Sequence, residues 1–216
     1  MLKERTHNTR MSANERQRQL LDAALSVFSL KGFKGATTKE IAAAAGVAEA
    51  VIFKHFPSKD ALYDAVLDLN LVTQKANHDV AEINGYLDRG DDEGLLRTVI
   101  RRILSSYRTN AAFQRVVLFA ALEGHEQGLN RLYEQFGPVY HHFKDYVERR
   151  QREGALTSCD PFVVLMSIVG IAHHYGLITS IMRVAVCDDI PDETVAEQFT
   201  KILLDGIRKR PPVKDS

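Results

Sequence analysis

The chain has 216 residues, of which 45% are hydrophobic and 26% are charged, and its 28 Lys and Arg balance its 28 Asp and Glu. This composition is typical of a soluble globular protein with one large or two small domains, and zero net charge gives no general attraction to nucleic acid. The charge is unevenly divided, because residues 1–60 hold ten Lys and Arg against six Asp and Glu.

The N-terminal segment, residues 1–13, has no apolar run, so it does not resemble a signal peptide and is predicted to be a flexible basic arm. The sequence leaves open whether Met1 or Met11 is the natural start. Cys159 and Cys187 make no metal-binding spacing, and two thiols in a chain of this size are typical of reduced residues in a cytoplasmic protein.

The apolar residues follow a helical period throughout, which predicts an all-α fold of about nine helices. A first helix over residues 14–31 should stop at Gly32. Two short helices are expected over 37–46 and 48–56, and Ser58 can cap a longer helix that follows.

The segment 84–94 is rich in glycine and acidic residues, which predicts a loop. Apolar stripes then predict helices over residues 96–107, 111–122 and 129–147. The last of these should be kinked at Gly137–Pro138, because proline removes an N–H group and clashes with the preceding turn.

Residues 161–182 contain no Asp, Glu, Lys or Arg and are about as long as a membrane-spanning helix. The segment contains the pair His173–His174, two serines and a threonine, and it has no aromatic belt at its ends. These features favour a helix buried in protein instead. No membrane partner is therefore expected. A final helix should run from Pro191 to about Arg208.

The stretch from residue 37 to 62 combines small residues with bulky and basic ones. Ala42 and Ala45 would let two short helices approach closely, and Gly46 suits a left-handed turn between them. Ile52 would then pack inward, so that the second helix presents its remaining side chains outward. The pattern alone fits either a helix-turn-helix or an ordinary helical hairpin.

The spacing of several residues in this stretch resembles the DNA-binding domain of the TetR family of transcriptional regulators. The resemblance covers roughly residues 14–62. The matching positions are Thr37–Thr38, Ile41–Ala42, Ala45–Gly46–Val47, Phe53–Lys54–His55–Phe56 and Ser58–Lys59–Asp60–Ala61–Leu62.

The resemblance implies an N-terminal three-helix helix-turn-helix domain over residues 14–60, followed by a helical effector-binding and dimerisation domain over 61–210. Phosphate contacts would fix the register and base contacts would read the operator. The implied DNA-binding residues are Thr37, Thr38, Lys39, Glu49, Ala50, Val51, Phe53, Lys54, His55 and Lys59.

Lys54 could donate to guanine and Glu49 could accept from cytosine. An acid in the first turn of a helix is also favoured by the helix dipole, so both interpretations of Glu49 stay open. Three positions depart from the family pattern. Ala48 replaces a capping serine, Phe53 replaces a tyrosine, and Val51 replaces a threonine.

The resemblance also implies a homodimer held by the last two helices as a four-helix bundle, with recognition helices about 34–36 Å apart on a two-fold operator. Small and apolar residues in one sector would form this interface, although the same sector would suit the core of a monomer. The predicted interface residues are Leu165, Val169, Ala172, Gly176, Ser180, Val195, Phe199, Ile202, Leu203 and Gly206.

The opposite sector of helix 161–182 contains His174, which is expected to face aromatic residues of the preceding helices. The resemblance implies a cavity there for a small, mostly apolar effector that shifts the dimer between two spacings. The same residues would also suit a plain core. The predicted pocket residues are Ile103, Tyr107, Phe119, Phe136, Tyr140, Phe143, Ile171, His174 and Ile178.

Metal binding and catalysis are not expected. Neighbouring residues on a helix diverge by about 100°, so neither His141–His142 nor His173–His174 can chelate a metal alone. His141 and Asp145 are one turn apart but have no second histidine. The sequence shows no nucleophile–base pair and no phosphate-binding glycine loop, so no cofactor is predicted.

The sequence therefore predicts a cytoplasmic, dimeric transcription factor that binds a double-stranded DNA operator and is a repressor released by a small ligand. Two alternatives stay open. One is an activator of the same family, and the other is a helical small-molecule- or metal-binding protein whose DNA-binding helix has degenerated.

Overall fold

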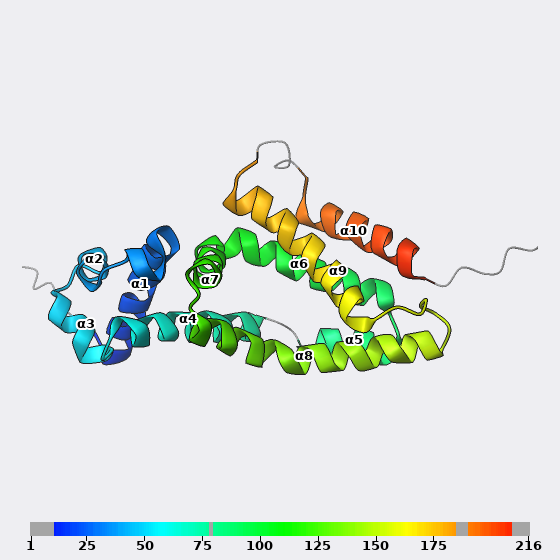
Figure 1. Ribbon diagram of the computed structural model, residues 1–216, viewed down its shortest axis with the longest axis horizontal. Coiled ribbons are helices and arrows are strands. Elements are labelled where there is room, and N and C mark those ends of the chain that lie inside the picture. Colours follow the sequence, from blue (N-terminus) through cyan, green and yellow to red (C-terminus); the bar gives the residue numbers. More distant parts are fainter. Residues whose placement is uncertain (1–10, 78–79, 185–189, 209–216) are drawn as a thin grey trace, which may run out of the picture.

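The computed structural model describes residues 11–77, 80–184 and 190–208. Within these residues the regular structure consists of ten α-helices and one π-helical turn, with a single β-bridge between Leu156 and Arg208. The predicted all-α class is confirmed. The molecule is elongated, with α1 to α3 at one end and the last turn of α10 at the other (Figure 1).

Side-chain caps fix the starts of several N-terminal helices. The side chains of Thr37 and Glu40 form a reciprocal capping box at α2, and Ser58 Oγ accepts from the N–H of Ala61 at 3.1 Å at the start of α4. These bonds satisfy N–H groups that have no partner within the helix. The first four helices are α1 (Ala13–Gly35), α2 (Thr38–Ala44), α3 (Glu49–His55) and α4 (Lys59–Asn77).

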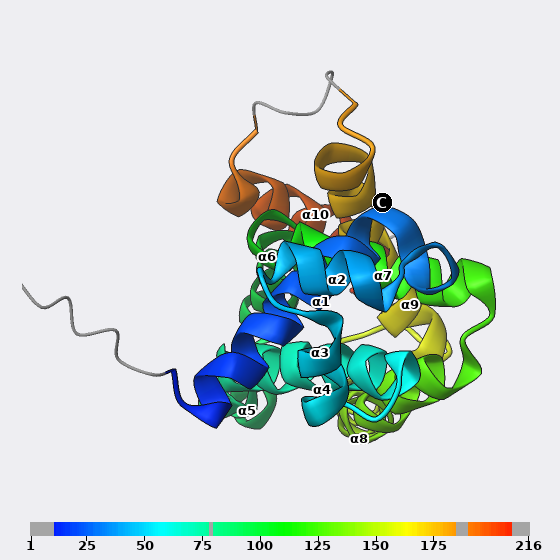
Figure 2. The ribbon, with the colours of Figure 1, turned by 90° about the vertical axis from the view of Figure 1, so that its left-hand side faces the viewer.

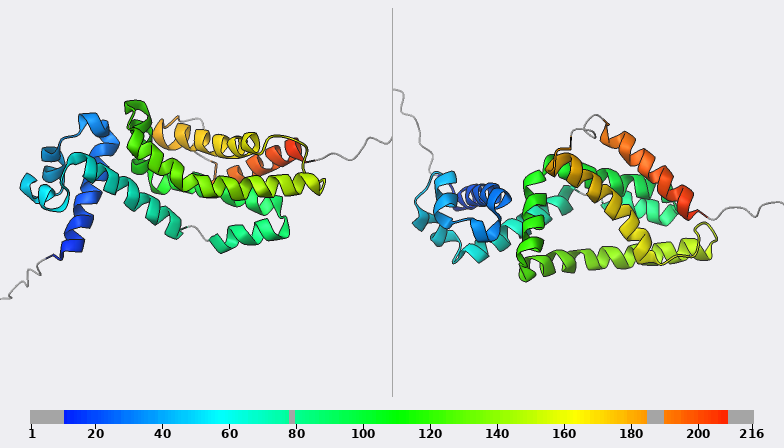
Figure 3. Two further views of the ribbon diagram at one scale, coloured as in Figure 1. Left: turned by 60° about the horizontal axis from the view of Figure 1, so that its bottom comes forward. Right: turned by 45° about the horizontal axis from the view of Figure 1, so that its top comes forward.

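The remaining helices surround α6, which packs against α5, α9 and α10. The long helix α8 runs beside α9, and α7 crosses between α1 and the long helices (Figure 3). These elements are α5 (Val80–Arg89), α6 (Asp92–Thr109), α7 (Ala111–Glu123), α8 (Glu126–Arg152), α9 (Pro161–Gly176), the π-helical turn η1 (Leu177–Ile181) and α10 (Asp192–Ile207).

Two hydrophobic clusters form the core. The first joins α1 to α4 and also includes Phe113, Val116 and Ala120 of α7, and the second joins α6, α8, α9 and α10. Fully burying one large aliphatic side chain contributes about 1.5–3 kcal/mol. Because Leu62 and Tyr63 are fully buried in the first cluster, the boundary predicted at residue 60 lies inside a continuous core.

Two segments differ from the sequence expectations. The segment 84–94 is helical as far as Arg89, because Tyr86 and Leu87 provide an apolar face that packs on the second cluster. Helix α8 includes Pro138, in agreement with the predicted helix, and the kink expected there stays a prediction. The apolar helix over 161–182 ends in a π-helical turn, a variant that sequence periodicity does not reveal.

A buried ion pair fastens the start of α6 to the end of α8. The carboxylate of Asp92, which is 8% exposed, accepts from Nε and Nη2 of Arg150 at 2.9 Å each and from the hydroxyl of Tyr146 at 2.6 Å. Burial, followed by this hydrogen bond, raises the pKa of Tyr146 well above its usual range. The two helices are therefore fixed to each other at the end remote from α3.

The C-terminal end of α10 is also anchored at this remote end. The N–H and the hydroxyl of Thr157, in the connection between α8 and α9, donate to the carbonyl of Ile207 at 2.8 Å and 3.0 Å. Leu156 forms its β-bridge with Arg208 alongside them. The last described residues of the chain are thus held by backbone hydrogen bonds as well as by side-chain packing.

Candidate DNA-binding surface

Small residues let α2 and α3 cross closely. Ala42 and Ala45 are 2% and 5% exposed, and Ile52 of α3 is fully buried. Gly46 in the turn has a φ of 65°, a conformation that favours glycine. The side-chain amide of Gln19 on α1 donates to the carbonyl of Ala45 at 2.9 Å. The predicted helix-turn-helix is therefore present and is fixed to α1.

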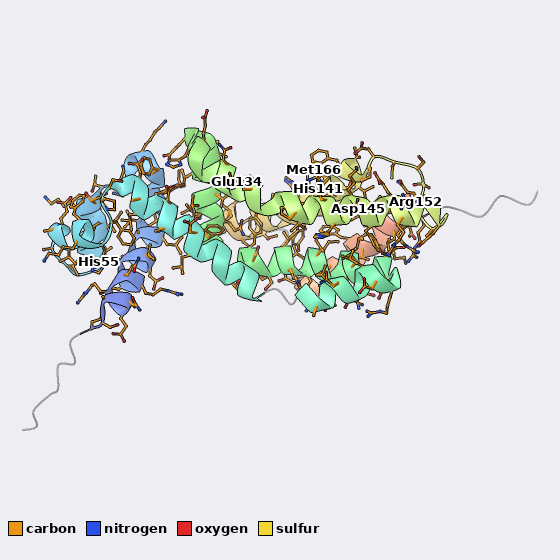
Figure 4. The ribbon with its side chains drawn as sticks, turned by 90° about the horizontal axis from the view of Figure 1, so that it is seen from below. His55, Glu134, His141, Asp145, Arg152 and Met166 are labelled. Atoms are coloured by element: carbon orange, nitrogen blue, oxygen red, sulfur yellow. The ribbon has the colours of Figure 1, made fainter. Side chains whose placement is uncertain are left out.

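Helix α3 presents an uncovered face at one end of the molecule (Figure 2). Phe53 is 51% exposed although it is a large apolar residue. The other predicted contact residues of this end have exposed or half-exposed side chains: Thr37, Thr38, Lys39, Glu49, Ala50, Val51, Lys54 and His55. His55 lies at this end of the molecule in the view from below (Figure 4). These side chains are thus gathered on one accessible surface.

The hydroxyl of Thr38 is already engaged within this surface, because it donates to Oε1 of Glu49 at 2.5 Å. A hydroxyl has one proton to donate. To donate to a phosphate, Thr38 would have to release Glu49, so the two residues are coupled. The spacing of the residues could not show this contact, because Thr38 and Glu49 lie on different helices.

Thr37 is occupied in a similar way. Its hydroxyl donates to Oε2 of Glu40 at 3.0 Å and accepts from the N–H of Glu40 at 3.2 Å. Lys31 Nζ lies 2.5 Å from the other carboxylate oxygen. The hydrogen bond from Lys31, and then those from Thr37, lower the pKa of Glu40. Thr37 thus holds the start of α2.

Lys59 does not point into the surface that α3 presents. Its ammonium group donates to the carbonyls of Phe33 and Ala36 at 2.8 Å and 3.0 Å and lies 4.3 Å from the centroid of the Phe33 ring. A phosphate contact was predicted for this residue. In the structure, Lys59 instead connects the start of α4 to the end of α1 through these two hydrogen bonds. The carbonyls that hold it lie 23 and 26 residues away, so the local motif gave no sign of them.

The absent cap of α3 is confirmed. Ala48 occupies the N-cap position and makes no side-chain hydrogen bond to the helix. Glu49 is the acidic residue of the first turn, where a negative charge is favoured by the helix dipole. The recognition helix is therefore held mainly by its packing through Ile52.

The predicted pocket residues lie in several environments. Ile103 and Phe143 belong to the second core cluster, whereas Phe119 lies against Gly32 of α1. Tyr140 meets the ring of Phe162 edge to face at 5.8 Å. Ile171 and Ile178 are half-buried, and the side chain of Phe136 lies outside the described residues.

The histidine that faces Tyr107 is His173 and not His174, so the prediction for His174 was wrong. The hydroxyl of Tyr107 lies 3.1 Å from Nδ1 of His173, while the side chain of His174 is exposed. The helix is apolar on every side, so its sequence contains no polar face that would fix its rotation. Close packing of Gly176 against the Tyr107 ring sets that rotation instead.

The same rotation places part of the predicted dimer interface inside the subunit. Ala172 is fully buried, Gly176 is buried, and Val195 is 3% exposed. Leu165, Phe199 and Leu203 pack on the second core cluster, and Val169 and Ser180 are half-buried. Among the predicted interface residues, Ile202 at 62% exposed and Gly206 are open to solvent.

A different stripe of α9 is exposed and was not singled out from the sequence. Phe162, Val163 and Met166 are 51%, 58% and 43% exposed, and Gly170 lies further along the same side. In the described part of the chain, Pro161–Ile181 is the one helical segment that is long and apolar enough to cross a membrane. The core helix of a soluble protein can have the same length and composition. Only 22% of its most apolar 18-residue stretch is buried within the subunit.

Two cavities lie at the end remote from α3. One of about 370 Å³ is lined by Asp92, Arg150 and Arg208 with their neighbours, and one of about 550 Å³ by residues near Gln151. Neither contains a predicted pocket residue. No cluster of three or more His, Cys, Asp or Glu side chains that could hold a metal occurs among the described residues. His141 and Asp145 are both exposed along α8 (Figure 4).

Residues 20–66, which include the helix-turn-helix, match the family model described as bacterial regulatory proteins of the tetR family. The match contains α2, α3 and the residues that pack them against α1 and α4. Residues 20–66 therefore form a DNA-binding domain of the TetR family. The protein is accordingly a DNA-binding transcriptional regulator, and the predicted family resemblance of this part is confirmed.

Relatives of this chain match beyond the DNA-binding helices. Nucleoid occlusion factor SlmA of Citrobacter koseri is 27% identical over 176 residues, which cover 79% of this chain and 84% of that protein. SlmA of Escherichia coli matches to the same extent. The similarity therefore extends through most of the helical part.

Solved structures share the whole fold. The ketosteroid transcriptional regulator KstR2 of Mycobacterium tuberculosis superposes with a TM-score of 0.67 at 19% identity, covering 92% of this chain and 98% of that one. The fatty acid degradation regulator FadR from Bacillus halodurans gives a TM-score of 0.68 at 17% identity, covering 93% and 100%. At these identities the likeness concerns the fold.

Proposed function

We propose that this TetR-family protein is a cytoplasmic repressor that binds a two-fold operator as a homodimer and is released by a small, mostly apolar ligand. The observation that carries the proposal is the uncovered face of α3, where Phe53 and Lys54 are exposed beside half-buried His55. An apolar ring beside basic groups on a short recognition helix suits the major groove.

The exposed positions divide into two kinds of contact. Lys54 and Glu49 carry groups that can pair with base edges, and Ala50 and Val51 can touch a thymine methyl. Lys39, Thr38 and His55 flank them and can reach phosphates, which fix the register without reading sequence. Lys59 is omitted from this set because its ammonium is held by two carbonyls.

The homodimer is proposed to form through the exposed stripe of α9 together with α10. Phe162, Val163 and Met166 on α9, and Ile202 on α10, leave apolar side chains in solvent. The described part of α9 contains no charged side chain that would oppose close contact. A second copy covering both helices would remove this apolar area from water.

The proposed effector site lies between α6, α7, α8 and α9. It would join Tyr107 and His173 with the apolar side chains of Ile103, Ile171 and Ile178. A mostly apolar lining with a few polar groups suits a small apolar molecule. Differential binding to two arrangements of the subunits would release the operator. The effector-binding and dimerisation domain, proposed over residues 61–210, would share its core with the DNA-binding domain through α4 and α7.

The experiment that tests the proposal is selection of random duplex DNA by the purified protein at about 50 mM and about 200 mM salt. The expected result is an enriched motif with two-fold symmetry, and an affinity for DNA that falls steeply as the salt concentration rises. Lys54→Ala should change the enriched bases, while Phe53→Tyr should tighten binding on all sequences by adding a phosphate donor. The absence of any motif, also after unfolding and refolding to remove a bound ligand, would contradict the proposal.

A second candidate function follows from the relatives. The nucleoid occlusion factors match over 79% of this chain, so a role on the nucleoid instead of at promoters is the competing proposal. Genome-wide occupancy separates the two. A repressor should occupy a few promoters, whereas an occlusion-type factor should occupy many sites irrespective of promoters.

A further inference from the structure

Helix α1 is broken near its C-terminal end. Gly32 has φ 69° and ψ −179° within the span Ala13–Gly35, so the residues after it begin a new helical turn. The first N–H groups of a helical turn have no partner within it and need one from outside. The break therefore leaves the amides of Phe33 and Lys34 to be satisfied by another part of the molecule.

The carboxylate of Glu123, the last residue of α7, supplies that partner. Its Oε2 accepts from the N–H of Phe33 at 2.8 Å, and its Oε1 accepts from the N–H of Lys34 at 3.2 Å. A Cβ at Gly32 would lie 2.3 Å from Oε1. The carboxylate thus fits against the break so closely that only glycine leaves room for it.

Phe33 carries the contact onward to α4. Its carbonyl accepts from Lys59 Nζ at 2.8 Å, and its ring meets those of Tyr63 and His125 edge to face at 5.1 Å and 4.9 Å. His125 follows α7, and Lys59 and Tyr63 belong to the first turns of α4. We call these five residues, Glu123, Phe33, Lys59, Tyr63 and His125, the α7 joint.

The α7 joint lies between the effector-binding helices and α3. Helix α3 is separated from Lys59 by only three residues, 56–58. A short connection of this kind leaves α3 little freedom relative to the start of α4. Charged hydrogen bonds to backbone groups are among the stronger polar contacts in proteins.

We infer that Glu123 is a positioning residue that fixes the separation of the two recognition helices in the dimer, and this inference rests on the proposed function. By holding Phe33 and Lys34, the carboxylate sets the angle between the α1–α3 unit and α7. Loss of the carboxylate would leave each helix-turn-helix folded but free to take a range of angles. The preference for one half-site spacing would then weaken.

The first test needs no DNA. Amide hydrogen exchange is compared in the wild type, Glu123→Ala, Glu123→Gln and Glu126→Ala. Glu126 is the matched control, because its carboxylate is exposed at the start of α8, three residues after Glu123. Phe33 and Lys34 should exchange faster in Glu123→Ala and to an intermediate degree in Glu123→Gln, which keeps one acceptor oxygen. Unchanged exchange at these two amides in Glu123→Ala would overturn the inference.

The second test measures the separation directly. Spin labels are placed on Lys39→Cys in a protein whose Cys159 and Cys187 are replaced by serine, and the label-to-label distance in the dimer is recorded. Glu123→Ala should broaden the distance distribution, whereas Glu126→Ala should not. A narrow, unshifted distribution in Glu123→Ala, alongside released amides, would also overturn the inference.

The third test uses duplexes with two copies of the selected half-site at varied spacings. Each added base pair rotates one half-site by roughly 34–36° and shifts it by about 3.4 Å. Glu123→Ala should lower the discrimination between the best spacing and its neighbours about tenfold while binding a single half-site as the wild type does. An unchanged spacing profile would refute the role. Failure of the wild-type protein to select DNA would instead refute the proposed function, and the exchange test would still decide on the joint.

Discussion

The hydroxyl of Tyr107 on α6 and Nδ1 of His173 on α9 lie 3.1 Å apart, and their rings meet edge to face with centroids 5.5 Å apart. Burial raises the pKa of Tyr107 and lowers the pKa of His173. Both groups are therefore neutral at neutral pH, and the hydrogen bond between them pairs a buried hydroxyl with a buried ring nitrogen inside an apolar region.

The lowered pKa of His173 predicts a loss of stability in acid. The unfolded chain protonates this imidazole near its ordinary pKa of about 6.5, whereas the folded chain does so only at lower pH. Between these two values the free energy of unfolding should fall as the pH falls, by at most about 1.4 kcal/mol per pH unit. The free energy of unfolding is measured by urea denaturation between about pH 7 and pH 5. Its slope against pH should be shallower for His173→Gln than for the wild type. His174→Gln, at the exposed neighbour, should retain the wild-type slope, and an equal effect of both variants would contradict the prediction.

The two hydrogen bonds from Lys59 predict that this residue stabilises the fold and does not bind phosphate. Lys59→Met should lower the free energy of unfolding by about 1–2 kcal/mol and leave the salt dependence of DNA binding unchanged. Lys39→Ala is the matched variant, because Lys39 is exposed on α2. It should reduce the slope of log affinity against log salt by about 0.9 for each phosphate that the lysine neutralises in the wild type. If Lys59→Met also reduced the slope of log affinity against log salt, Lys59 would bind phosphate after all, and the prediction would be wrong.

The exposed stripe of α9 predicts where a charge breaks the dimer. Met166→Lys and Ile202→Lys would each place an ammonium group in the proposed interface between two subunits. Each should weaken dimerisation at least about a hundredfold. Sedimentation equilibrium measures this directly. Leu122→Lys is the control, because Leu122 is an apolar residue of α7 that is 83% exposed. A dimer unaffected by both interface variants would locate the contact elsewhere.

The buried carboxylate of Asp92 predicts a large loss on truncation. Asp92→Ala would leave Arg150, which is 19% exposed, with the exposed carboxylate of Glu153 as its partner. The free energy of unfolding should drop by about 3 kcal/mol. Glu153→Ala removes the other carboxylate and should cost under about 1 kcal/mol. Chemical denaturation of the two variants measures the difference. Equal losses of unfolding free energy would contradict the prediction that the buried Asp92 carboxylate contributes more than the exposed Glu153 carboxylate.

The helix-turn-helix could be predicted from sequence because its determinants are local. Thr37 caps α2, Gly46 makes the turn, and Ala48 fails to cap α3, all within a dozen residues of one another. Each of these positions has a conformational requirement that few residue types meet. Their spacing therefore specifies both the motif and its missing cap.

The rotation of α9 and the role of Lys59 could not be predicted, because their determinants are distant. Nothing in an entirely apolar helix distinguishes His173 from His174 until Gly176 packs on Tyr107, a residue of another helix. Lys59 fits a phosphate-binding pattern locally, and only the break at Gly32 turns the nearby carbonyls toward it. Tertiary contacts decided both outcomes.

The anchored end of α10 has a practical consequence for studying the protein. Thr157 holds the carbonyl of Ile207, so the last described turn of α10 lies at the end opposite α3, near Arg152 in the view from below (Figure 4). A fluorescent protein or a purification tag fused directly after Arg208 would therefore begin far from α3. A tag fused directly before α1 would begin at the same end of the molecule as α3, and shortening the chain into Ile207 would remove the hydrogen bonds from Thr157.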